Sequence, residues 1–340
     1  MLAEDLLGEQ RRKGLRVALA VSVGFTVSVA SGAIVPFLGP LFAAQFLLSN
    51  AQPLPPGKAL GMSVLILVVG IFMRILTGWF GDEPVVFLLL LGLIYFSCFV
   101  AQTAGKGGAA VFLILVVTVM VPLLGILNKE LASSILSILT IGVVTGGLLM
   151  WLAHALIPEP RQSAAQTPQP AATMAPDVPR ALANTAILLS AVAICLTSDN
   201  LTSAVVIPVT VVSLLGQLDI AASGRASFGL VIVNLLGGVI ASVAYAVLTI
   251  RPNLFSMFVI MLVVCLMLGG RAAARSPDAK VYAGALTTFL ILFGLGVSPL
   301  PGSAAESFST RILFVAMAIG FVFLTTALLW QHPRNKGVAA

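Results

Sequence analysis

Long apolar runs are the feature that most constrains what this chain can fold into. A helix needs about 20 mostly apolar residues to cross a bilayer, because the hydrocarbon core is about 30 Å thick and each residue adds 1.5 Å. The sequence holds about twelve such runs, which predicts an all-α, polytopic membrane protein. The runs are residues 15–32, 34–50, 61–80, 84–103, 109–127, 131–156, 181–198, 201–217, 226–250, 253–270, 281–299 and 307–330.

Composition excludes the soluble classes. Hydrophobic residues make up 59% of the 340 residues and charged residues only 9%, whereas about a quarter of a soluble domain is charged. So few charges cannot cover a soluble globule, which excludes a cytosolic enzyme, a nucleic-acid-binding protein and a disordered chain. The net charge of +6 does not indicate nucleic acid, because the basic residues lie between apolar runs, where they orient a membrane protein.

The second and eighth runs are the least regular. Pro36 and Pro40 interrupt residues 34–50, and Pro208 interrupts residues 201–217. Irregular backbone survives within a membrane only where protein or a water-filled cavity covers it. Either these runs cross the membrane fully, or they form a re-entrant or broken pair.

The basic residues predict the topology. With the N-terminus in the cytoplasm, 14 of the 18 Lys and Arg residues lie on the cytoplasmic side, and only Lys129 and Arg251 lie outside. Arg74 and Arg311 fall within predicted spans. This positive-inside bias predicts that both termini are cytoplasmic.

The two sets of six runs resemble each other: after the fourth run they align at an offset of 178 residues, and up to it at an offset of 168 residues. At this offset Arg12 aligns with Arg180 and Pro40 with Pro208. Because six is even, both sets enter and leave on the same side, which predicts two parallel repeats related by an axis along the membrane normal. We expect an N-terminal cytoplasmic segment (1–14), a first repeat (15–156), a flexible cytoplasmic linker (157–180), a second repeat (181–330) and a cytoplasmic tail (331–340).

No pattern of enzyme chemistry occurs. The sequence lacks a phosphate-binding GxxxxGK[ST] loop and the HExxH, GxSxG and CxxC patterns. Cys98, Cys195 and Cys265 each lie inside an apolar run, which predicts buried, inert thiols. We expect no enzyme activity, no cofactor and no metal. Duplicated helical bundles enclose a pathway between their halves, so transport is the function we expect.

Rare polar residues within the spans are the candidate site. An ionisable group inside a bilayer costs at least about 2.5–3.5 kcal/mol, so it usually faces a cavity or a partner. We predict that Arg74, Arg311 and Asn234 bind an anionic substrate, with Asp199 or Glu306 as a proton acceptor. The structural alternative is that the arginines pair with these carboxylates or extend to the membrane surface.

A family resemblance rests on soft motifs that cover nearly the whole chain. They are the opening LRVALAVSVGF, the proline-broken VPFLGP, and a basic residue before a glycine-bearing span at Lys58–Gly61 and Arg225–Gly229. The chain resembles the fusaric-acid-resistance and aromatic-acid-exporter superfamily, which includes plant malate channels. It is most similar to a short bacterial branch without the cytoplasmic domains of larger relatives.

The resemblance implies an exporter of aromatic or other organic acids in the bacterial inner membrane. It also implies a periplasmic adaptor of the membrane-fusion (HlyD-type) class and an outer-membrane channel as partners, and it permits a homo-oligomer. Lys58 and Arg225 would guide anions at the cytoplasmic entrance. A proton gradient is the expected energy source. Two alternatives stay open: a passive anion channel, and a membrane scaffold that anchors an adaptor and transports nothing.

Overall fold

The computed structural model describes residues 2–49, 52–106, 108–127, 129–158, 176–197, 206–218, 224–274, 276, 278–298, 317–318, 320–322 and 324–326. Apart from short turns these residues are helical, with no strand among them. The helices are α1 (Leu2–Ala30), α2 (Leu38–Ser49), α3 (Pro56–Phe80), α4 (Pro84–Ala101), the π-helical η1 (Gln102–Lys106), α5 (Gly108–Leu127), α6 (Lys129–Leu156), α7 (Val178–Leu196), α9 (Val206–Leu218), α10 (Gly224–Ile250), α11 (Leu254–Ala272) and α12 (Ala279–Val297).

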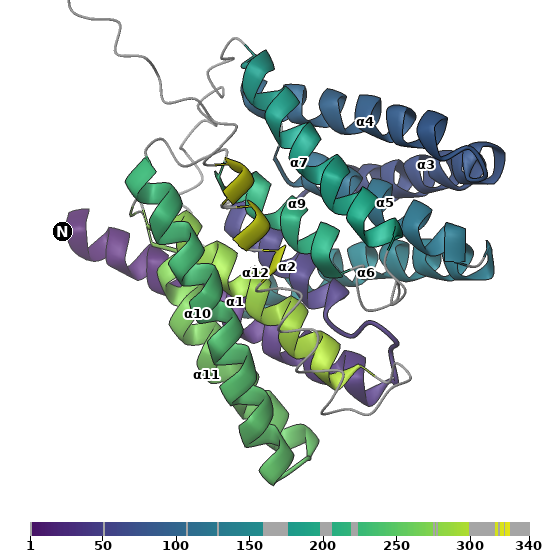
Figure 1. Ribbon diagram of the computed structural model, residues 1–340. Helices are drawn as coiled ribbons and strands as arrows, with labels where there is room; N and C mark the ends of the chain where they lie inside the picture. Colours follow the sequence, from purple (N-terminus) through teal and green to yellow (C-terminus); the bar gives the residue numbers. More distant parts are fainter. Residues whose placement is uncertain are drawn as a thin grey trace, which may run out of the picture.

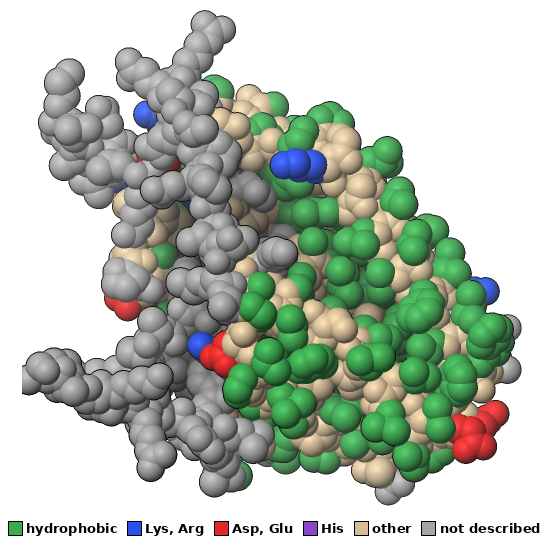
Figure 2. All heavy atoms as spheres, turned by 90° about the horizontal axis from the view of Figure 1, so that it is seen from above, with side chains coloured by type: hydrophobic (Ala, Val, Ile, Leu, Met, Phe, Trp, Pro, Cys, Tyr) green, Lys and Arg blue, Asp and Glu red, His purple; other side chains and the backbone are tan. Residues whose placement is uncertain are grey.

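The long apolar helices make the chain a multi-pass membrane protein. Six stretches within the described residues are long and apolar enough to cross a membrane: Gly8–Ala30, Pro56–Phe80, Pro84–Gly105, Ser134–Leu156, Val178–Leu196 and Leu254–Ala272. Figure 2 shows hydrophobic side chains spread over the described part of one face, with only scattered charges among them. Large apolar side chains such as Trp79 and Phe255, each 77% exposed, point outward. Lipid is the solvent that such a surface requires.

Two helical hairpins lie at opposite ends of the molecule. Figure 1 shows α3 and α4 at one end, α10 and α11 at the other, and α2, α9 and α12 between them. Helices from before residue 157 pack against helices from after residue 176. Helix α1 packs against α11, and α4 packs against α7. Within these two parts of the sequence, α3 packs against α5, and α10 packs against α12.

Helix α2 runs back alongside α1, as two sets of contacts show. At one end of the molecule, Lys13 Nζ donates a hydrogen bond to the Leu48 carbonyl over 2.9 Å, and Trp151 Nε1 donates to the Leu54 carbonyl over 2.8 Å. At the other end, Ser298 Oγ donates to the Ile34 carbonyl. Residues 31–49 therefore return the chain from the end of α1 to the level of Lys13.

The helices start and end at different residues from the apolar runs. Helix α1 begins at Leu2, well before residue 15, because the polar segment that precedes the apolar run consists mostly of good helix formers. Helix α2 is shorter than the predicted run 34–50, because a turn occupies residues 31–37 and Gly32 adopts a φ of 72° there. The described part of α9 begins at Val206, and residues 201–205 of the predicted run lie outside the described residues.

Candidate functional site

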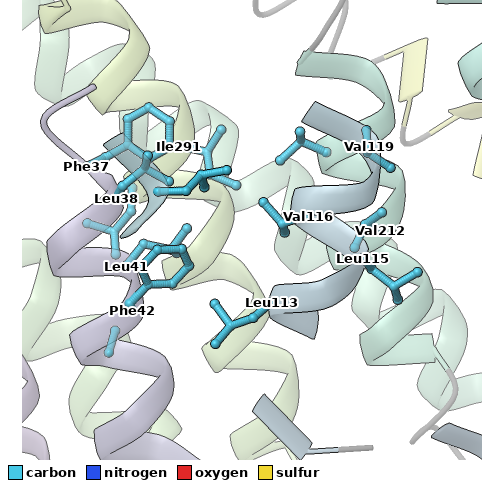
Figure 3. Close-up of a cluster of buried hydrophobic side chains, with 14 of the residues drawn as sticks. Phe37, Leu38, Leu41, Phe42, Leu113, Leu115, Val116, Val119, Val212 and Ile291 are labelled. Atoms are coloured by element: carbon cyan, nitrogen blue, oxygen red, sulfur yellow. The ribbon is translucent and has the colours of Figure 1, made fainter. Parts of the chain in front are cut away.

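The centre of the molecule is a cluster of apolar side chains where α2, α5, α9 and α12 meet. Figure 3 shows side chains from the α2 and α12 region facing those of α5 and α9. Every residue from 284 to 294 in α12 is buried, and so is every residue from 208 to 215 in α9. The central cluster comprises Phe37, Leu38, Leu41, Phe42, Leu113, Leu115, Val116, Val119, Val212 and Ile291.

The two short helices at this centre cannot cross a bilayer unaided. Helix α2 has 12 residues and the described part of α9 has 13, which correspond to about 18 Å and 20 Å of a core about 30 Å thick. From Lys13 to Ala30, α1 rises about 25 Å, whereas α2 returns only about 15 Å up to Leu48. The turn at residues 31–37 therefore covers about 10 Å of the return. Such backbone within a membrane requires a protein or water-lined surrounding.

Neutral polar groups lie among the apolar side chains of the centre. Gln45 Nε2 on α2 donates a hydrogen bond to Thr287 Oγ1 on α12 over 3.1 Å. Thr118, Thr210 and Ser213 are also buried on α5 and α9. The centre therefore combines a large buried apolar surface with a few polar side chains.

Of the predicted site residues, only Arg74 and Lys58 have side chains in the described part of the chain, and they lie far apart on α3. Arg74 is exposed on α3, among outward-facing apolar side chains and away from the central cluster. Lys58 is exposed in the first turn of α3, about 24 Å from Arg74 along the helix. Arg225 and Asn234 belong to α10. Their side chains, and residues Asp199, Glu306 and Arg311 altogether, lie outside the described part of the chain.

Two basic residues that the sequence does not single out point inward. Arg16 is only 2% exposed, and its Nε donates a hydrogen bond over 2.8 Å to the carbonyl of Ile157, just past the end of α6. Lys13 contacts the last turn of α2 through the Leu48 carbonyl. Both cations lie at the carbonyl ends of helices, where the helix dipole favours positive charge. The distribution of basic residues along the sequence predicts only that Lys13 and Arg16 lie on the cytoplasmic side. It does not predict their contacts with these carbonyl groups.

A third missed residue is Asn184, which lies fully buried on α7. The predicted repeat places it opposite Arg16, because the offset that aligns Arg12 with Arg180 also aligns Arg16 with Asn184. Among the described residues, no group of three His, Cys, Asp or Glu side chains is arranged to hold a metal ion. Cys98, Cys195 and Cys265 are buried free thiols.

Residues 13–153 match the sequence model of a family described as a protein of unknown function (DUF2955). The matched stretch begins in α1 and ends in α6. No curated protein and no solved structure matches the chain.

Proposed function

We propose that the chain consists of two parallel six-helix repeats. The reciprocal packing supports this arrangement: the first helix of each half, α1 or α7, packs against the fourth helix of the other half, α11 or α4. Each half also pairs its third helix with its fifth and holds a short second helix. The family match from residue 13 to residue 153 covers nearly all of the first half.

We propose that the protein is a transporter whose substrate pathway runs between these halves. The observation that carries this proposal is the pair of short helices α2 and α9, one from each half, at the centre of the molecule. Helices that stop within the membrane are typical of substrate sites at the interface between transporter repeats. The central cluster would separate the two sides of the membrane in this conformation.

We propose organic anions, chiefly aromatic carboxylic acids, as substrates and export from the bacterial cytoplasm as the direction. The apolar centre with its Gln45–Thr287 hydrogen bond suits an aromatic body. The basic excess on one side, the cytoplasm in this proposal, suits a negative charge. A proton gradient would drive export, and a periplasmic adaptor would continue the path. Roles for Arg311, Asn234, Asp199 and Glu306 are part of the same proposal.

The test is transport of radiolabelled benzoate by the purified full-length protein in liposomes. An exporter accumulates benzoate against its gradient faster than protein-free liposomes do when a proton gradient is imposed, and an uncoupler abolishes this excess accumulation. A passive channel instead passes anion current under an applied voltage with the uncoupler present. A membrane scaffold does neither, and that result would contradict the proposal.

Two substitutions locate the pathway in the same assay. Gln45→Leu removes the polar contact between α2 and α12, and we expect several-fold slower transport, with only about 0.6 kcal/mol lost from stability. Arg74→Gln should leave transport near the wild-type rate, because the side chain is exposed on the outer face of α3. Loss of transport in Arg74→Gln would instead support the role expected from the sequence.

A further inference from the structure

Matching positions in the two halves hold buried polar side chains with different surroundings. Arg16 on α1 and Asn184 on α7 occupy equivalent positions of the repeat, four residues after the aligned pair Arg12 and Arg180. Arg16 donates a hydrogen bond to the Ile157 carbonyl. The Asn184 side chain is 0% exposed, yet neither its Oδ1 nor its Nδ2 has a hydrogen-bond partner in the described part of the chain.

An unpaired amide in this position calls for a partner that the described residues do not supply. A buried amide loses its hydrogen bonds to water on folding and destabilises the folded state when nothing replaces them. Native proteins leave few such groups, and those that remain are accounted for by a bound ligand, water or ion, or by a functional role. An apolar side chain at position 184 would fold with less cost, so the amide indicates a ligand.

The surroundings of Asn184 favour an anion. Arg180 lies one helical turn earlier, so the two side chains share one face of α7. Arg180 is half-buried near the end of the helix, and Asn184 lies about 6 Å deeper. The N-terminal turns of α7 add the positive end of the helix dipole. One carboxylate is near: the exposed Asp177 accepts the backbone N–H of Arg180 over 3.2 Å and lies about 10 Å along the axis from Asn184.

We propose that Arg180 and Asn184 bind the carboxylate of the transported organic anion. The proposal rests on the transport function proposed above and adds the residues that recognise the charged group. The guanidinium supplies the opposite charge, and Asn184 Nδ2 donates a hydrogen bond to a carboxylate oxygen. Because α7 packs against α4, the bound carboxylate lies at a contact between the two halves. The matching Arg16 already bonds the Ile157 carbonyl, so the site belongs to one half only.

The experiment measures binding of radiolabelled benzoate to the full-length protein in lipid nanodiscs, together with its melting temperature. Asn184→Leu should weaken binding by about tenfold or more, because it removes a hydrogen bond to a charged group. The same variant should melt at a higher temperature than the wild type, because it removes an unpaired buried amide. Arg180→Gln should weaken benzoate binding at least as much. Benzamide, which lacks the charge, should compete poorly with benzoate.

Two matched controls separate a binding role from a structural one. Thr185→Val changes the next buried polar residue, whose hydroxyl is already bonded to the Ala181 carbonyl over 2.8 Å, so it should raise neither the melting temperature nor the dissociation constant. Arg251→Gln removes an exposed arginine at the turn between α10 and α11 and should leave binding unchanged.

The outcomes distinguish the site from the function. If Asn184→Leu and Arg180→Gln both bind benzoate with wild-type affinity and the protein still transports it, the proposed site is wrong. The proposed transport function would not be affected. A lower melting temperature for Asn184→Leu would also overturn the proposed site, because the amide would then be bonded within the protein. Wild-type protein that neither binds nor moves benzoate would refute both proposals.

Discussion

Arg16 is a basic side chain that joins α1 to α6 inside the protein. Arg16→Met keeps an apolar stem of similar length but removes the donor to the Ile157 carbonyl. We expect it to lower the free energy of unfolding by about 1.5–3 kcal/mol, the range for hydrogen bonds to charged groups. Thermal melting in nanodiscs measures the change, and Arg11→Met on the exposed side of α1 is the control. Equal melting of the two variants would contradict this assignment.

At the residue scale, the sequence supports only part of what the structure contains. Buried thiols at Cys98, Cys195 and Cys265 follow from the apolar runs around them and are confirmed. The role of Arg16 could not be predicted, because its partner lies 141 positions away. The sequence alone could not show which side of α3 faces outward, so it could not reveal that Arg74 is exposed.

At the scale of helices, close crossings of backbone decide how α1 meets α11. A Cβ atom built on Gly14 would lie 2.9 Å from the Cα of Gly270, too close for a normal contact. Gly14→Ala should therefore force the two helices apart and cost about 1–3 kcal/mol. Gly61→Ala, in α3, meets open space and should stabilise the protein by about 0.5–1 kcal/mol. If the melting temperatures of Gly14→Ala and Gly61→Ala shift in the same direction, the close contact between α1 and α11 at Gly14 would be contradicted.

Apolar runs predict helices well because the bilayer demands a fixed length of apolar chain. The third and fourth runs, at 61–80 and 84–103, correspond closely to α3 and α4. The correspondence fails where protein rather than lipid surrounds the chain: the turn before α2 is allowed only because other helices cover its buried Pro36 and Phe37. The residue types in the run 34–50 do not predict that other helices bury this turn.

For the whole molecule, the direction of α3 tests the topology. This helix has 25 residues, about 37 Å, and its ends carry the exposed Lys58 and Asp82. Single cysteines at these positions should react with a membrane-impermeant maleimide from opposite sides, Lys58→Cys from the cytoplasm and Asp82→Cys from the periplasm. The three native thiols are buried and should stay unlabelled. The reverse pattern would place both termini outside.

The proposed repeat aligns the two halves in sequence, but nothing in the aligned residues predicted that α1 would pack against α11 and α7 against α4. Sequence similarity reports which helices correspond, whereas the choice of neighbours depends on surfaces formed by residues far apart in the chain. Gly14 meets Gly270 across such a surface.

Because α1 packs against α11, it must remain without this partner until α11 has been synthesised. Leu254, the first residue of α11, is translated long after Gly14, and the interval is roughly 12–48 s at about 5–20 residues per second. During that time the glycine-bearing side of the first helix has only lipid or an insertion chaperone beside it. A gene divided within the predicted linker at residues 157–180 should then yield two fragments that fold only when the cell makes both.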